Sequence, residues 1–193
     1  MIFLLTGTPD ITALAFGQAE MTLKAGQHME LGLTVTPADA SRATIQYACS
    51  NPNLAMITDD GILYALDGGT VMVYASAGEV SSSCKVIITA DAAQIRLEPI
   101  SERVAVGNTM TLTPVFIPAS TTDRTLTWTS SNESIATVDG NGVVTAVSEG
   151  SAEITARSVN GMEARSVIRA VIPAEGVSLD ETSTTAYTGS SYT

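Results

Sequence analysis

The chain has 193 residues, of which 45% are hydrophobic and 15% charged, with 9 lysines and arginines against 20 aspartates and glutamates. A formal net charge of -11 excludes a basic surface for nucleic acid or an anionic membrane, and the hydrophobic fraction is too high for a disordered acidic tail. The length suits one large globular domain or two small ones.

Residues 1–10 are predicted to form a lead-in segment ahead of the first folded unit. The apolar run Ile2–Leu5 is far shorter than a membrane span, and no lysine or arginine precedes it. Pro9 and Asp10 interrupt the apolar stretch that a secretory signal peptide requires. We therefore expect neither a signal peptide nor membrane insertion at this end.

Residues 11–90 show the pattern of an antiparallel β domain. Hydrophobic and polar residues alternate over Met29–Val35 and again over Val71–Ala75, as in strands that place one face on a core. Between these strands, Asp59–Gly61 separates two apolar runs and suits a tight hairpin turn. No stretch of this unit has the spacing of a long amphipathic helix.

Residues 91–172 repeat this pattern, with a boundary near Asp91 and Ala92. The segment Gln46–Ser76 aligns without a gap on Thr127–Arg157, at a shift of 81 residues. The matched pairs are Tyr47 and Trp128, Ser50-Asn51 and Ser131-Asn132, Ala55 and Ala136, Gly61 and Gly142, Ala65 and Ala146, and Gly69 and Gly150. A repeat of this length is a whole small domain, longer than a solenoid unit.

The second unit has its own turn and strand signals. Asp139–Gly142 forms another turn of hairpin type, and Pro114 removes a donor from its strand, which predicts an edge or a bulge there. About seven short strands per unit with an aromatic on a central strand indicate a two-sheet sandwich. The predicted fold class is all-β, with tandem immunoglobulin-like antiparallel β-sandwiches.

Residues 173–193 are predicted to begin a third, incomplete domain. Gly176–Thr193 matches Gln94–Thr111 at a shift of 82 residues. A piece of this size buries no core of its own, so we expect the sequence to belong to a longer array. The alternative is that this segment donates a strand to the open edge of a neighbouring chain.

With these residues in view, the chain resembles the bacterial immunoglobulin-like domain, group 2 family. The second unit carries nearly the whole pattern in Val106-Gly107, Thr111-Leu112, Pro118-Ala119 and Leu126–Ala156. The first unit is a diverged copy, with Tyr47 for the tryptophan, Cys49 for the serine and Leu54–Ile57 in the Ile-Ala-Thr-Val position. The resemblance implies stalks, spacers or weak binding surfaces on surface proteins, exoenzymes or phage particles, and no family-wide catalytic residue.

His28, the single histidine, has no counterpart in the second unit, so a Ser-His-Asp triad would rest on one unmatched residue. Two cysteines and one histidine placed apart are too few for a zinc site. Asp59, Asp60, Asp139 and Asn141 offer oxygen ligands but do not match a calcium loop, and turn chemistry already explains them. We expect no catalytic, cofactor-binding or metal-binding residues and no cofactor, with weak calcium binding as the alternative.

Cys49 and Cys84 are both predicted to face the core of the first unit. The sequence alignment places Ser130 and Ile168 opposite them in the second unit, so the fold needs no bridge there. This favours two buried thiols and leaves a disulfide as the alternative.

An intramolecular Lys-Asn isopeptide bond would require a buried lysine. The only lysines are Lys24 and Lys85, and the alignment places Ala105 and Arg169 at their positions in the second unit. Such a bond is therefore not expected.

Tyr64, Tyr74 and Met72 are predicted to face outward in the first unit, where the second unit has Thr145, Thr155 and Glu153. Packing against a neighbouring unit or chain is the favoured interpretation of this asymmetry, and a ligand or assembly patch is the alternative.

Taken together, these patterns predict a non-enzymatic stalk or spacer of an externally displayed bacterial surface protein that mediates cell adhesion or surface display, located extracellularly or at the cell surface. The alternative is a phage virion structural protein with projecting Ig-like domains. Expected partners are neighbouring Ig-like domains of the same chain and protein or surface glycan contacts, with no nucleic acid and no membrane insertion. An accessory module of a secreted glycan-cleaving enzyme is neither supported nor excluded.

Overall fold

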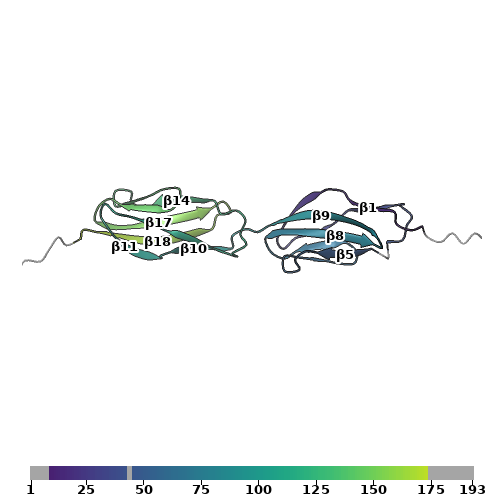
Figure 1. Cartoon of the computed structure of the whole chain (residues 1–193). Coiled ribbons are helices and arrows are strands. Elements are labelled where there is room, and N and C mark those ends of the chain that lie inside the picture. Colours follow the sequence, from purple (N-terminus) through teal and green to yellow (C-terminus); the bar gives the residue numbers. More distant parts are fainter. Residues whose placement is uncertain (1–8, 43–44, 174–193) are drawn as a thin grey trace, which may run out of the picture.

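The computed structural model describes residues 9–42 and 45–173. These residues form two β-sandwiches that lie end to end, with strands running along the long axis of the pair (Figure 1). Within these ranges there is no α-helix, and hence none long and apolar enough to span a membrane. The predicted tandem Ig-like β fold is confirmed. The lead-in up to residue 8 and the third unit from residue 174 lie outside the described residues.

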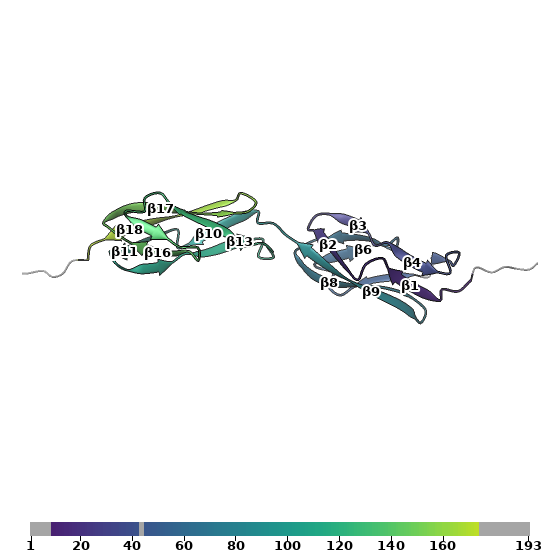
Figure 2. The same ribbon diagram turned by 90° about the horizontal axis from the view of Figure 1, so that it is seen from above.

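Unit 1 contains nine strands: β1 (Ala13–Phe16), β2 (Glu20–Lys24), β3 (His28–Glu30), β4 (Leu33–Thr36), β5 (Gln46–Cys49), β6 (Ala55–Ile57), β7 (Ile62–Ala65), β8 (Gly69–Ala77) and β9 (Val80–Thr89). One layer is a four-stranded sheet in the order β2-β9-β8-β5, in which β2 runs parallel to β9. The other layer holds the three-stranded sheet β3-β7-β6 and the antiparallel pair β1-β4. Figure 2 shows β3 and β6 on one side of the unit and β8 and β9 on the other.

Unit 2 repeats this topology with β10 (Gln94–Glu98), β11 (Ser101–Ala105), β12 (Thr109–Thr111), β13 (Thr113–Ile117), β14 (Leu126–Ser130), β15 (Ala136–Val138), β16 (Val143–Ala146), β17 (Gly150–Ser158) and β18 (Glu163–Val171). Its sheets are β11-β18-β17-β14, β12-β16-β15 and the pair β10-β13. Pro114 lies in β13, whose one ladder partner among the described strands is β10, so this strand is an edge, as predicted.

The alternating residues of the two layers form a separate core in each unit. Leu63 of β7 and Val73 of β8 are fully buried in unit 1, and Val144 and Ile154 occupy the matching positions in unit 2. Because apolar residues alternate with polar ones, each strand buries one row of side chains between the sheets. Unit 1 has a further cluster at the end remote from unit 2, built around Leu14, Leu33, Val35, Ala40, Ile45 and Ala75.

The repeated aromatic lies beneath the repeated turn glycine. A Cβ on Gly142 would come within 2.8 Å of the Trp128 ring and 2.9 Å of the Leu112 carbonyl oxygen, and Gly142 has a φ of +80°. Gly61 has the same φ and lies 2.9 Å from the Tyr47 ring by the same measure. Trp128 and Tyr47 are both half-buried and pack against the cores from the side.

The strand registers correct the alignment of the last strand. Val73 pairs with Cys84, whereas its equivalent Ile154 pairs with Ser166. The hairpin between β17 and β18 is one residue longer than that between β8 and β9, so the shift changes from 81 to 82 across it. Cys84 therefore corresponds to Ser166 and not to Ile168. By the same register Lys85 corresponds to Val167 and not to Arg169, because the predicted pairs assumed a shift of 84 residues in the last strand where the register gives 82.

Candidate functional site

His28 lies on β3 and is engaged by an aromatic neighbour. Its imidazole stacks on the Tyr64 ring, with centroids 5.4 Å apart and an interplanar angle of 27°. Within the described ranges, no group of three or more His, Cys, Asp or Glu side chains is placed to hold a metal ion. The surroundings of His28 are thus those of a surface ring pair.

This ring pair belongs to a row that crosses the outer face of the three-stranded sheet. His28 and Met56 both lie opposite Tyr64 in the strand register, and Tyr64 and Met56 are 36% and 52% exposed. The corresponding row of unit 2 is formed by Thr109, Thr145 and Thr137. Unit 1 therefore exposes an apolar row where unit 2 exposes hydroxyl groups.

Tyr74 and Met72 do not belong to this row. Both lie on β8, in the four-stranded sheet, where Tyr74 pairs with Ala48 and Ser83. Because the two sheets of a sandwich turn their outer faces away from each other, Tyr64 and Tyr74 lie on opposite sides of unit 1. The outward-facing aromatics thus form two small separate surfaces.

The two cysteines lie in one row of the four-stranded sheet with another strand between them. Cys49 on β5 and Cys84 on β9 both pair with Val73 on β8. Two strand spacings separate their Cα atoms by about 9 to 10 Å, beyond the roughly 7 Å reach of a disulfide. Both thiols are free, and Cys84 is buried whereas Cys49 is half-buried. The disulfide alternative is therefore wrong, and burial raises the pKa of the Cys84 thiol.

The carboxylate in the acidic turn of unit 2 is hydrogen-bonded by backbone N–H groups of the same turn. The Asp139 carboxylate accepts hydrogen bonds from the backbone N–H groups of Asn141 at 2.8 Å and Val143 at 2.9 Å. These bonds hold the pKa of Asp139 below its usual range. In unit 1 the hydroxyl of Thr58 takes the same role by accepting from Ile62 N–H at 3.1 Å. Both sets of contacts are those of turn-forming side chains.

The two lysines are exposed and paired with carboxylates. Lys24 Nζ lies 2.5 Å from Asp91, and Lys85 Nζ lies 2.8 Å from Glu20. Their side chains are about half exposed, which is not the buried setting that an isopeptide bond requires.

The repeated serine of the Ser-Asn motif extends the sheet beyond its last backbone pair. Ser50 Oγ accepts from Met72 N–H at 2.9 Å, and Ser131 Oγ accepts from Glu153 N–H at 2.8 Å. The following asparagines, Asn51 and Asn132, accept backbone N–H groups two residues on. This motif therefore serves the fold in both units.

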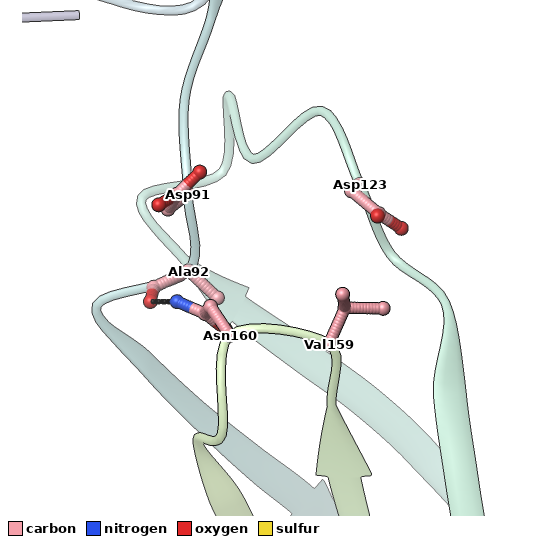
Figure 3. A pocket seen from close by; sticks show the side chains of 5 residues that line it. All are labelled: Asp91, Ala92, Asp123, Val159 and Asn160. Atoms are coloured by element: carbon pink, nitrogen blue, oxygen red, sulfur yellow. Dashed lines mark hydrogen bonds between the residues drawn. The ribbon is translucent and has the colours of Figure 1, made fainter. Parts of the chain in front are cut away.

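Sequence reasoning predicted a boundary near Asp91 and Ala92 but missed the contacts that the junction between the units makes. A hollow of about 250 Å³ there is lined by Asp91, Ala92, Asp123, Val159 and Asn160 (Figure 3). Asn160 donates to the Ala92 carbonyl at 2.7 Å. Asp91 is paired with Lys24, and the Asp123 carboxylate points away from Asp91 and accepts from Thr125 N–H at 2.9 Å. Both carboxylates are thus engaged in local contacts.

Two turns that are far apart in the sequence meet beside this hollow. The Ser120 hydroxyl of unit 2 donates to the Asp67 carboxylate of unit 1. Asp67 also accepts from Gly68 N–H at 2.8 Å, and these two bonds lower its pKa, with the Ser120 contact having the larger effect. Each residue alone is typical of a turn, so only their proximity marks them as a contact.

Comparison with known proteins places this geometry in a family and a fold. The family model of the bacterial Ig-like domain (group 2) matches residues 10–88 and 91–168. An uncharacterised protein of Clostridium acetobutylicum is 33% identical over 153 residues, which are 78% of this chain and 16% of that protein. An Ig-like virion protein of Serratia phage KSP90 is 27% identical over 143 residues, which are 70% of this chain and 55% of that protein.

A solved structure agrees on the fold. The N-terminal four Ig domains of Dscam1 isoform 9.44 match with a TM-score of 0.51 at 12% identity, over 86% of this chain and 47% of that one. At this identity the likeness concerns the fold alone. The chain also spans only 16% and 55% of the two relatives named above, so it corresponds to a part of each.

Proposed function

The chain belongs to the bacterial Ig-like domain (group 2) family, and we propose that it acts as a non-enzymatic spacer within an externally displayed protein. The observation that carries this proposal is the arrangement of two sandwiches in series. The chain enters unit 1 at the end remote from unit 2 and leaves unit 2 at the far end of the pair (Figure 1). Each added unit then lengthens the reach of whatever the protein carries.

The parallel pairing of the second strand with the last strand in each unit supports a mechanical role. In unit 1, β2 lies parallel to β9 over five residue pairs, and in unit 2, β11 lies parallel to β18 over five. Tension along the chain pulls these parallel strands lengthwise in opposite directions. Their hydrogen bonds are then loaded together in shear, which resists extension better than opening one bond at a time.

The absence of catalysis is part of the proposal. It is supported by the family match, which is to an Ig-like domain and not to a catalytic family. It is further supported by His28, whose ring is stacked on Tyr64. Contacts to neighbouring Ig-like domains, and to proteins or glycans through exposed faces, are the partners proposed for such a spacer.

Two settings fit a displayed spacer. The first is a bacterial surface protein that extends an adhesive or display element from the cell. The second is a phage particle, which is favoured by the likeness to the Ig-like virion protein of Serratia phage KSP90, of whose length this chain spans 55%.

Fractionation tests the proposal and separates the two settings. Virions and cell envelopes are separated, and each fraction is analysed by intact mass and peptide mapping for peptides of residues 91–172. Recovery in envelopes supports the bacterial surface protein, and recovery in purified particles supports the virion component. Recovery in the cytosol alone would refute the proposed display.

A further inference from the structure

We propose that the joint between the two units is a fixed one, formed by docking of the Asp67-Gly68 turn of unit 1 on the Ser120–Thr122 turn of unit 2. The two sandwiches then move as one rigid body. This inference builds on the proposed function, because a fixed joint gives a spacer a defined length and direction. It assigns that property to named residues.

The connecting segment is held by unit 2 over its whole length. Ala90 and Ala92 are each 4% exposed, and Ala92 belongs to the core cluster of unit 2. Thr122 N–H donates to the Ala90 carbonyl at 2.9 Å, and Ala90 N–H donates to Thr122 Oγ1 at 3.2 Å. Ala93 N–H donates to the Ile117 carbonyl at 2.8 Å. The connection is therefore an extension of the fold of unit 2.

Contacts from the body of unit 1 hold both the connecting segment and the Ser120–Thr122 turn. Lys24 of β2 reaches Asp91, and the Asp67 carboxylate accepts the Ser120 hydroxyl. A swing of unit 1 about the connecting segment would break both contacts. The Lys24–Asp91 pair is weak because it is exposed, and the half-buried Asp67–Ser120 contact is a single hydrogen bond. Close packing of the two turns therefore has to supply the rest.

That packing depends on the missing side chain of Gly68. A Cβ at this position would lie 2.5 Å from the Ser120 carbonyl oxygen and 2.8 Å from the Ala90 Cβ. The φ of Gly68 is outside the left-handed region, so its backbone conformation suits any residue. Glycine is required here by the approach of the partner turn and not by its own turn geometry.

The receiving turn is itself braced. Arg124 donates to the Thr121 carbonyl at 3.1 Å and to the Ala119 carbonyl, and its guanidinium lies 5.4 Å from the Phe116 ring centroid. Thr121 is 4% exposed and donates to the Pro118 carbonyl at 2.7 Å. A turn held in this way cannot yield to an added methyl group without loss of these contacts.

The docking residues are particular to this joint. In the repeat alignment Ser148-Glu149 replace Asp67-Gly68, and Asp39 replaces Ser120. Glu149 has a side chain where docking requires none, and Asp39 would place a second carboxylate opposite Asp67. Much of the remaining sequence of the two units aligns, but the residues that make this contact do not. The fixed joint is thus encoded by these few residues and not by the fold that both units share.

Residual dipolar couplings of the chain spanning residues 1–193 test the proposal, comparing wild type with Gly68→Ala. The wild type is expected to fit one alignment tensor for both units. Gly68→Ala is expected to require two, while the couplings within each unit still fit that unit. Gly140→Ala is the matched control, because Gly140 also lacks a left-handed φ and has no atom within 4 Å of its Cβ position. The control is expected to retain the single tensor.

Two tensors in the wild type, or a single unchanged tensor in Gly68→Ala, would overturn the fixed joint. If Gly68→Ala disturbs the spectrum of unit 1 beyond its turn, Ser120→Asp decides instead. It places a second carboxylate opposite Asp67 and leaves the turn of unit 1 unchanged in sequence, so it is expected to require two tensors, and a single tensor would again contradict the proposal. A flexible wild type found in envelopes or particles would refute the joint alone, whereas a cytosolic protein with one tensor would refute the spacer alone.

Discussion

The Gly142→Ala substitution tests how the repeated turn glycine and the repeated aromatic depend on each other. With a φ of +80°, alanine at position 142 carries a left-handed backbone cost of about 1 to 2 kcal/mol. Its methyl group would also lie 2.8 Å from the Trp128 ring and 2.9 Å from the Leu112 carbonyl oxygen. Overpacking of this kind costs about 1 to 3 kcal/mol. We expect unit 2 to lose about 2 to 5 kcal/mol of unfolding free energy in total.

Gly107→Ala separates the two contributions. Gly107 has a φ of +87° but no atom within 4 Å of its Cβ position, so alanine there carries only the backbone cost of about 1 to 2 kcal/mol. The excess loss in Gly142→Ala then measures the contact with Trp128 and Leu112.

Denaturant unfolding followed by tryptophan fluorescence is the assay. Trp128 is the single tryptophan of the chain, so its emission reports on unit 2 without a contribution from unit 1. Small domains have about 5 kcal/mol or somewhat more to lose, so a loss at the upper end of the expected range would bring unit 2 close to its unfolding midpoint in water. Equal losses in Gly142→Ala and Gly107→Ala would show that the turn does not pack on the ring as described.

Two further predictions concern the thiols and the acidic turn. Because Cys49 and Cys84 are unbridged, a strong reductant should leave the melting temperature of unit 1 unchanged. Alkylation of the unfolded chain without reductant should label both thiols. An unlabelled chain whose mass is two hydrogens below the sequence mass would contradict this prediction. Hydrogen bonds from the backbone N–H groups of Val143 and Asn141 lower the pKa of Asp139 in the folded state. The charged carboxylate therefore contributes its full share to the stability of unit 2 above the ordinary aspartate pKa of about 3.9, and this contribution is lost as the pH falls through the lower folded pKa. Unit 2 should therefore become less stable below about pH 4, by a smaller amount in Asp139→Asn than in wild type, and equal acid sensitivity of the two proteins would refute the assignment.

The fold class could be predicted from the sequence because strand alternation and the repeat can be recognised along the chain itself. Alternation over Met29–Val35 places residues on one face of a strand, and the period between Tyr47 and Trp128 reveals two copies. These signals depend on which face of a strand meets the core. They are insensitive to how strands are joined, which is why the fold class could be predicted while the equivalence of Cys84 and Ser166 was missed.

That missed equivalence has a physical meaning. Ser166 is fully buried and donates to the Pro99 carbonyl at 2.7 Å, whereas Cys84 donates to the neighbouring Lys85 carbonyl at 3.4 Å. The same holds two strands away in the sheet, where Ser130 donates to the Ala136 carbonyl at 2.6 Å and Cys49 donates to the Ala55 carbonyl at 3.2 Å. Two serines of one core have thus been exchanged for two thiols in the other. Once the register is known, Cys49 and Cys84 are seen to occupy the positions of two hydrogen-bonding serines and not those of a bridge.

The contact between the two turns at the joint could not be predicted from the sequence, for a different reason. Asp67 and Gly68 are typical of a turn, and so are Ser120 and Thr122, so neither segment signals contact with the other. Their meeting depends on the orientation of one sandwich on the next, which no periodicity within a unit reports. Outward residues differ between the copies in another way: most buried positions are apolar in both units, whereas the exposed row of His28, Tyr64 and Met56 is replaced by threonines. Packing restricts the inner rows of each copy, so two units of one fold differ most freely in their outer rows and at the joint.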